Sequence, residues 1–257
     1  MKDDDKIVKY IIENVLGKYM YRYKTPDYYP VVVGGSTFHY CKPNYISIPI
    51  SDIDIVFVTN DHDPSIMKIK AMEKSRMKFI SDIINDDDLK LNNINLEIDW
   101  IYKRKPELKR IQTIKLVRLK YNDNVVFDIC IQYPSINRFL GKYPIASKKQ
   151  IVPYVENKGI LWATCTYVKY EIVRILIHYH HMFKKNEIHH LRLKSYLKYI
   201  KKICILLNIS KLHDIDIDIN NIQDVFEQIQ NNSKFKRIQK KLEKNIPDLT
   251  KEAIIYD

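Results

Sequence analysis

Two aspartates, Asp52 and Asp54, lie two residues apart in the apolar stretch 51–58 (SDIDIVFV). The alternating pattern predicts a β-strand, in which side chains two residues apart project from the same face. The isoleucines beside the aspartates then point to the other face and the core. Two neighbouring carboxylates in a desolvated setting repel each other unless a cation lies between them, and hard oxygen ligands favour Mg²⁺ or Mn²⁺. The spacing therefore predicts a divalent-metal site.

A site that holds two metal ions needs a third carboxylate from another direction. Asp128 is the strongest candidate, because it interrupts an apolar strand pattern in which Phe127 and Ile129 face the opposite way. A charge at such a position is costly unless a partner compensates it. Asp99 and Glu97 are weaker rivals, since their strand alternates fully and its polar face is expected to be solvated.

A glycine pair precedes these carboxylates, where the short apolar strand 31–33 ends at Gly34, Gly35 and Ser36. Without side chains, the backbone N–H groups of the two glycines can approach a triphosphate closely. Ser36 adds a hydroxyl at the expected start of a helix, where anions are favoured. We therefore predict that this turn binds a nucleotide.

Together, the segments VVVGGSTF, ISDIDIVFV and VVFDICI resemble the DNA polymerase β-like nucleotidyltransferases. In that superfamily, three carboxylates bind two Mg²⁺ ions and the glycine turn contacts the nucleoside triphosphate. The resemblance implies catalytic and metal-binding roles for Asp52, Asp54 and Asp128, and nucleotide-binding roles for Gly34, Gly35 and Ser36. The spacer before Asp52 is longer than in the superfamily, with CKPNYISIP inserted, which concerns the path of this loop rather than the carboxylates.

The elements that would position these residues follow from hydrophobic periodicity and turn residues. We predict helices over 6–23 and 64–84, strands over 31–33, 51–58 and 94–100, and a hairpin of 111–121 and 125–132. After residue 155 the pattern becomes helical, with helices over 160–183, 190–207, 221–230 and 233–242. This order predicts an α/β (α+β) nucleotidyltransferase domain over 1–155, with a small mixed sheet flanked by helices, and a mostly α-helical domain over 156–257 that binds nucleotide or RNA.

The charge of the chain favours an anionic partner, because 43 Lys and Arg residues against 31 Asp and Glu residues give a net charge of +12. Residues 158–213 hold 11 basic and 2 acidic residues, interleaved with tyrosines at 167, 170, 179, 196 and 199. Basic residues with aromatic side chains suit single-stranded nucleic acid. A solvated helix face with core tyrosines explains the pattern equally well. A second basic stretch, 102–110, could contact the same nucleic acid.

The helical segments NKGILWATCTYVKYEIVRIL and LRLKSYLKYIKKICILLN resemble the region that follows the catalytic domain in poly(A) polymerase catalytic subunits of large DNA viruses. This resemblance implies template-independent transfer of AMP from ATP to an RNA 3′ end, with two Mg²⁺ or Mn²⁺ ions. Three alternatives stay open: an oligoadenylate or cyclic-dinucleotide synthase, a small-molecule or protein nucleotidylyltransferase, and a catalytically silent RNA-binding subunit. Action as a homodimer or with an accessory subunit also stays open.

Several other classes of protein lack support in the sequence. No window holds about 18 uncharged apolar residues, and the N-terminus is acidic where a signal peptide would be basic, so we expect an intracellular protein, in the host cytoplasm or the virion if it is viral, without a membrane partner. The four cysteines, Cys41, Cys130, Cys165 and Cys204, lack C-x₂-C spacing, so we expect reduced thiols and no zinc finger. Six of the eight histidines fall within 178–213 without the spacing of a zinc site. The DIDIDI run at 214–219 has no glycine turn before it and is expected to be solvated.

Overall fold

The structure is a computed structural model that describes residues 3–43, 52–59, 61, 65–104, 113–132, 152–185, 190–213 and 217–245. The chain divides into two compact units. Unit 1 comprises Met1–Ile136 and Lys148–Cys165, and unit 2 comprises Asn137–Ser147 and Thr166–Asp257.

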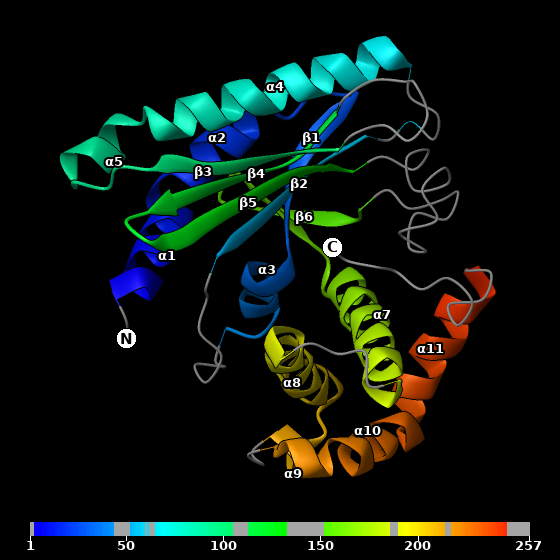
Figure 1. Cartoon of the computed structure of the whole chain (residues 1–257). Helices are drawn as coiled ribbons and strands as arrows, with labels where there is room; N and C mark the ends of the chain where they lie inside the picture. The colour runs from blue at the N-terminus through cyan, green and yellow to red at the C-terminus, as the bar shows by residue number, and fades with distance from the viewer. Residues whose placement is uncertain are drawn as a thin grey trace. The chain divides into compact units, whose positions relative to one another are not determined.

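Unit 1 is built on a seven-stranded mixed sheet with the strand order β3-β4-β5-β2-β1-β7-β6 (Figure 1). The strands are β1 (Tyr28–Val33), β2 (Ile53–Thr59), β3 (Glu97–Arg104), β4 (Thr113–Tyr121), β5 (Asn124–Gln132), β6 (Tyr154–Asn157) and β7 (Ile160–Ala163). At the centre, β2 runs parallel to β5 and antiparallel to β1, and β1 runs parallel to β7. The prediction of an α/β domain with a mixed sheet is confirmed.

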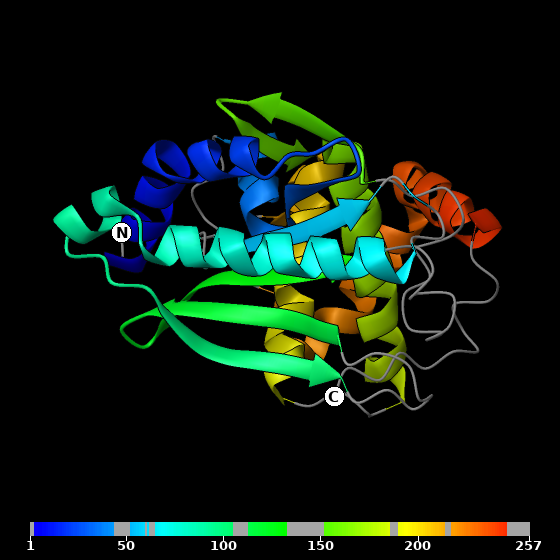
Figure 2. The same ribbon diagram turned by 90° about the horizontal axis from the view of Figure 1, so that it is seen from above.

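Helices cover both faces of this sheet. They are α1 (Asp3–Asn14), α2 (Leu16–Arg22), α3 (Gly34–Cys41), α4 (Ile66–Ile84) and α5 (Asp87–Leu91). Helix α4 lies on one face and α3 on the other (Figures 1 and 2). Phe57 of β2 packs edge-on against Phe79 of α4, with 5.4 Å between the ring centroids. Because side chains alternate along a strand, Asp54 projects from the opposite face, where α3 lies.

Two predictions for unit 1 helices differ from the structure. The single helix expected over 6–23 is two helices, α1 and α2, separated at Val15, which is buried. Helix α5 was not predicted, because it is only five residues long and turn-forming residues flank it on both sides. Its start is fixed by the buried Asp86, whose carboxylate accepts a hydrogen bond from the backbone N–H of Leu89 at 3.0 Å.

Residues 160–163 were predicted to begin a helix and instead form strand β7. All four side chains of Ile160–Ala163 are buried. In an apolar run this short, hydrophobic periodicity does not distinguish a strand from a helix. The hairpin to β6 closes through Lys158 and Gly159, both with positive φ. Both strands of this hairpin belong to the first compact unit, whose last residue is Cys165.

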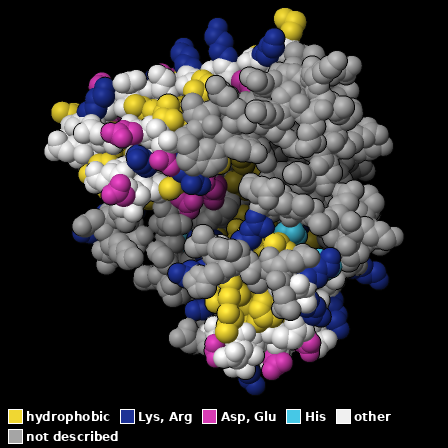
Figure 3. Space-filling model, viewed as in Figure 1, with side chains coloured by type: hydrophobic (Ala, Val, Ile, Leu, Met, Phe, Trp, Pro, Cys, Tyr) yellow, Lys and Arg dark blue, Asp and Glu magenta, His cyan; other side chains and the backbone are white. Residues whose placement is uncertain are grey.

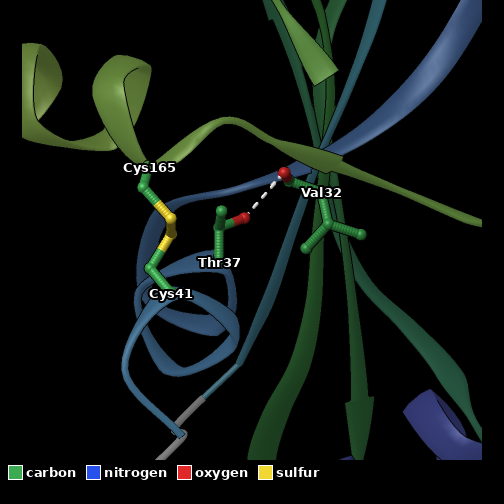
Figure 4. The surroundings of a disulfide bond; sticks show 4 residues. All are labelled: Val32, Thr37, Cys41 and Cys165. Atoms are coloured by element: carbon green, nitrogen blue, oxygen red, sulfur yellow. Dashed lines mark hydrogen bonds between the residues drawn. A yellow bond between two sulfur atoms is a disulfide. The ribbon is translucent and has the colours of Figure 1, made fainter. Parts of the chain in front are cut away.

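The expectation of four reduced cysteines is wrong for two of them. Cys41 at the end of α3 and Cys165, two residues after the end of β7, form a disulfide, with 5.6 Å between their Cα atoms (Figure 4). The pairing follows from the topology: α3 leaves β1, and β1 is the neighbour of β7 in the sheet. Sequence spacing does not reveal this contact, because 124 residues separate the two cysteines.

Unit 2 is helical, as predicted. Its elements are α7 (Cys165–Lys184), which starts at the last residue of unit 1, α8 (His190–Leu207), α9 (Ser210–His213), the 3₁₀ helix η1 (Ile219–Asn221), α10 (Ile222–Asn231) and α11 (Ser233–Asn245). Its core gathers aromatic rings, with His180 stacked on Phe226 and Phe226 edge-on to Phe235. Within the described part of the chain, no helix has the length and apolar character needed to cross a membrane.

The buried His180 makes the stability of unit 2 depend on pH. Its Nδ1 lies 2.6 Å from the Tyr196 hydroxyl, and burial lowers the pKa of His180 from 6.5 to about 4. Between pH 4 and pH 6.5 the unfolded chain binds more protons than the folded one. The contribution of neutral His180 to the free energy of unfolding is therefore fully present above pH 6.5 and is lost as the pH falls toward 4. We expect this group to lower the free energy of unfolding by about 3 kcal/mol across that window.

Urea unfolding at pH 7 and pH 4.5 measures this effect. The variant His180→Gln keeps an amide for the Tyr196 hydroxyl and cannot titrate, so its stability should change less with pH. His181→Gln, at the adjacent half-exposed position, should retain the full dependence. Equal pH dependence in the wild type and His180→Gln would contradict the assignment.

Candidate active site

Three carboxylates converge on the face of the sheet where α3 lies. Asp54 on β2 and Asp128 on β5 are register partners in a parallel pair, and Asp52 directly precedes β2. One oxygen of each carboxylate lies within 4.8 Å of the others, and all three residues are half-buried. Among the residues that the structure describes, no other three His, Cys, Asp or Glu side chains form such a group. The structure thus brings the three predicted aspartates together.

The glycine turn lies directly against Asp54. Gly34 begins α3 with a φ of +66°, a conformation that favours glycine. A Cβ atom on Gly34 would overlap the Asp54 carboxylate and lie 2.9 Å from its Cγ. Two separate constraints therefore favour glycine at position 34: the backbone conformation and the close approach of Asp54. Gly35 follows in the first turn of the helix.

Ser36 connects the start of α3 to the first carboxylate. Its side chain is buried, and its hydroxyl donates a 2.7 Å hydrogen bond to the backbone carbonyl of Asp52. The next residue, Thr37, donates to the Val32 carbonyl at 2.7 Å (Figure 4). These bonds tie the N-terminal half of α3 to the end of β1 and to the residue before β2. In this arrangement Ser36 holds the backbone of Asp52, while its predicted contact to a nucleotide stays a prediction.

We expect Gly34→Ala to lower any activity of this site by about 100-fold, because the methyl group must displace the Asp54 carboxylate. The positive φ adds strain of order 1 kcal/mol, so the thermal midpoint should fall by only a few degrees. Gly35→Ala is the matched control for the thermal midpoint, since Gly35 has no positive φ. Activity and thermal unfolding measured on both variants test this, and a fully active Gly34→Ala protein would refute the close approach.

Arg118 is a member of the site that sequence reasoning missed. It lies on β4 directly opposite Asp128, and its guanidinium donates from Nε to Oδ1 and from Nη2 to Oδ2, each at 2.8 Å. The hydrogen bonds to Asp128 raise the pKa of Arg118, and the charges of Asp99 and Asp52 act in the same direction. The charge on Asp128 is thus compensated within the sheet, as its apolar surroundings require.

The rival carboxylates lie outside this cluster. Asp99 and Glu97 on β3 are exposed, as expected for a wet polar face, and Asp99 pairs with Lys120 at 3.6 Å. Figure 3 shows acidic side chains gathered next to basic ones over the strands of unit 1. In the DIDIDI run, Asp218 is exposed and caps η1, whereas residues 214 and 216 lie outside the described residues.

The donor set fits a divalent cation. Three carboxylates supply only oxygen ligands, which Mg²⁺ and Mn²⁺ prefer. Their convergence within 4.8 Å would be repulsive in a half-buried place unless positive charge compensates it. Asp52, Asp54 and Asp128 are therefore the residues that could hold a metal ion here.

The basic region of unit 2 divides into core and surface. Tyr167 and Tyr196 are buried, so these two belong to the core and do not stack on bases, whereas the tyrosines at 170, 179 and 199 are partly exposed. Among the basic residues, Arg174 and Lys202 are buried as well. The second basic stretch, 102–110, lies outside the residues whose side chains are described.

Helix α11 adds a basic surface that the sequence prediction did not single out. Its apolar residues Phe235 and Leu242 are buried, and Phe235 packs against Phe226 of α10. Up to residue 242, where its side chains are described, its exposed residues are nearly all basic: Lys234, Lys236, Arg237, Lys240 and Lys241. The sequence feature that could have predicted this surface is the basic segment SKFKRIQKKLEKN, which lies outside the 158–213 region.

Comparisons with known proteins give distant structural likenesses only. No protein-family model matches the sequence, and no curated protein matches it. A Megavirus polyadenylate synthase is similar over 89% of this chain and 37% of its own chain, with 13% identity and a TM-score of 0.36. An antigenic nucleotidyltransferase-like protein from Paracoccidioides brasiliensis is similar over 95% of this chain and 94% of its own, with 11% identity and a TM-score of 0.40. At these TM-scores the likenesses carry no weight for function, which depends on the geometry of the carboxylates.

Proposed function

We propose that this protein is a nucleotidyltransferase that adds AMP from ATP to an RNA 3′ end without a template. The observation that carries the proposal is the convergence of Asp52, Asp54 and Asp128 beside the turn at Gly34. A nucleotidyl transfer needs carboxylates that bind metal and a backbone turn that accepts phosphates, and we assign these tasks to the carboxylate cluster and to the turn beside it.

In this proposal each residue has a defined task. Asp52, Asp54 and Asp128 would hold two Mg²⁺ ions, and Gly34, Gly35 and Ser36 would form the turn that receives the triphosphate. Bound there, the ions would activate the acceptor hydroxyl and neutralise the leaving pyrophosphate. The 3′ oxygen forms a bond to the α-phosphorus while the bond from that phosphorus to the β-phosphate oxygen breaks. The products are RNA longer by one AMP, pyrophosphate and one proton.

The choice of RNA as acceptor depends on the resemblance of the helical segments to viral poly(A) polymerase subunits and on the charge of unit 2. The exposed basic side chains of α11 provide a surface for phosphates. Because Phe235 and Leu242 of the same helix are already buried in the protein, the side chains described for this helix leave no exposed apolar stripe to enter a lipid bilayer.

The test is an assay of labelled ATP with Mg²⁺, with and without an oligo(A) primer. Extension of the primer one AMP at a time, and no product without primer, is the expected result. Oligoadenylates or cyclic dinucleotides formed without primer would identify a synthase instead. Labelled protein or small molecule would identify a nucleotidylyltransferase of that kind. The absence of any Mg²⁺-dependent ATP turnover would leave the silent RNA-binding subunit and overturn the proposed activity.

Removal of charge from α11 should weaken RNA binding and its dependence on salt. In the variant Lys236→Gln/Arg237→Gln/Lys240→Gln, we expect the slope of log K against log[salt] to fall by about 2, since each phosphate contact to a single strand contributes about 0.7. The matched control is Lys70→Gln/Lys74→Gln/Lys78→Gln, which removes three exposed charges from α4. Equal slopes in the two variants would show that net charge, not α11, governs binding.

A further inference from the structure

The cross-strand pair of Arg118 and Asp128 depends on a bulge in the β4–β5 hairpin. Tyr121 faces Asn124 and Lys120 faces Val125, but the register shifts by one residue between Lys120 and Leu119. Continued without the shift, that register would set Arg118 opposite the core residue Phe127 instead of Asp128. Bulges commonly re-aim side chains next to functional sites. The hairpin is therefore built so that a guanidinium meets the third carboxylate.

The pair engages the whole of the Asp128 carboxylate. Arg118 binds both oxygens in a fork, and the two side chains are 29% and 17% exposed. Two-point pairing of this kind fixes the rotation of the carboxylate as well as its position. A cation shared by the three aspartates would also need an oxygen of Asp128, because its nearest oxygen lies within 4.8 Å of those of Asp52 and Asp54.

We propose that Arg118 is a positioning residue that acts as the counter-cation of Asp128 and sets the affinity of the carboxylate cluster for divalent cations. With three carboxylates and one guanidinium, the local charge is less negative than the carboxylates alone provide. The guanidinium holds the Asp128 carboxylate in one orientation before a cation arrives, and its own positive charge lowers the affinity for that cation. This inference rests on the proposed metal-binding function of the cluster.

Equilibrium binding of Mn²⁺, followed by the electron paramagnetic resonance signal of unbound Mn²⁺, tests the proposal without any assay of activity. We expect Arg118→Gln to bind Mn²⁺ about tenfold more tightly than the wild type, since a unit charge roughly 6 Å from a divalent ion in an aqueous dielectric corresponds to about that factor. Arg118→Lys keeps the charge and loses the fork, and should stay within about threefold of the wild type. Equal or weaker binding by Arg118→Gln overturns the proposal.

A matched control lies two residues away on the same strand. Lys120→Gln removes the same unit of charge, but Lys120 pairs with Asp99 rather than with the cluster, so Mn²⁺ affinity should change less than twofold. A tightening in Lys120→Gln equal to that in Arg118→Gln would attribute the effect to net charge and overturn the role of Arg118.

A measurement on the wild-type protein removes any dependence on the folding of a variant. The Nε–H of Arg118 bonds Oδ1 of Asp128, so its NMR resonance, assigned by its absence from Arg118→Lys, should shift as Mg²⁺ is added. A resonance unmoved at saturating Mg²⁺ overturns the proposal. If the wild type has no saturable Mn²⁺ site, the proposed function fails together with this inference. If the site exists and Arg118→Gln does not tighten it, only this inference fails.

Discussion

Asp54→Asn is expected to abolish AMP transfer, with a loss of at least about 1,000-fold in kcat/KM. Asp54 is the central member of the cluster: it is the register partner of Asp128, and its carboxylate lies against Gly34. The amide has nearly the shape of the carboxylate but carries no charge and is a poor ligand for Mg²⁺. The substitution therefore removes a negative charge and a metal ligand, while it preserves the packing of the side chain.

Stability separates this loss from unfolding. Three carboxylates within 4.8 Å repel one another, so neutralising one of them should leave the thermal midpoint unchanged or higher. Asp99→Asn is the matched control, because Asp99 is exposed on the same sheet and pairs with Lys120. Primer extension by Asp99→Asn should stay within about twofold of the wild type. If Asp54→Asn retains more than a tenth of the wild-type rate, the cluster is not the catalytic centre.

The carboxylates could be predicted from sequence because the information is local. The two-residue period of a strand determines that Asp52 and Asp54 share a face, and the apolar neighbours of Asp128 show that this charge needs a partner. Two separate strand predictions suffice, and the parallel pairing of β2 with β5 then brings the faces together.

Arg118 could not be predicted in the same way, because its position depends on a register between strands. Counting back from the two-residue turn at Asn122 and Asp123 sets Arg118 opposite Phe127, on the wrong face for Asp128. One extra residue in β5 reverses this, and nothing in the pattern of apolar residues marks where a bulge falls. Site residues whose position depends on the register between strands are therefore the ones that sequence patterns do not predict.

The sequence also did not reveal strand β7, which lies between β1 and the edge strand β6, and so did not reveal the disulfide. Four buried apolar residues, Ile160–Ala163, merge in sequence with the apolar stripe of α7, so they were predicted as helix. Once β7 is known to lie beside β1, the ends of α3 and β7 become neighbours, and Cys41 meets Cys165.

Removal of this disulfide is expected to cause the largest loss of stability of any change outside the core. The cysteines close a loop of 124 residues, and loss of such a cross-link costs about 3 to 5 kcal/mol through the entropy of the unfolded chain. For a chain of this length, Cys41→Ser/Cys165→Ser should lower the thermal midpoint by roughly 10 °C. Activity at low temperature should change little, since Ser36 and Thr37 hold the N-terminal half of α3 through their own hydrogen bonds.

Thiol counting and reduction test the cross-link directly. The wild type unfolded without reductant should show two thiols, those of Cys130 and Cys204, and four after reduction. Dithiothreitol should lower the thermal midpoint of the wild type and of Cys130→Ser, but not that of the double serine variant, because only the last lacks the bond. Four thiols without reductant, or equal sensitivity to dithiothreitol in all three proteins, would mean that the helix holding the glycine turn is anchored by packing and hydrogen bonds alone.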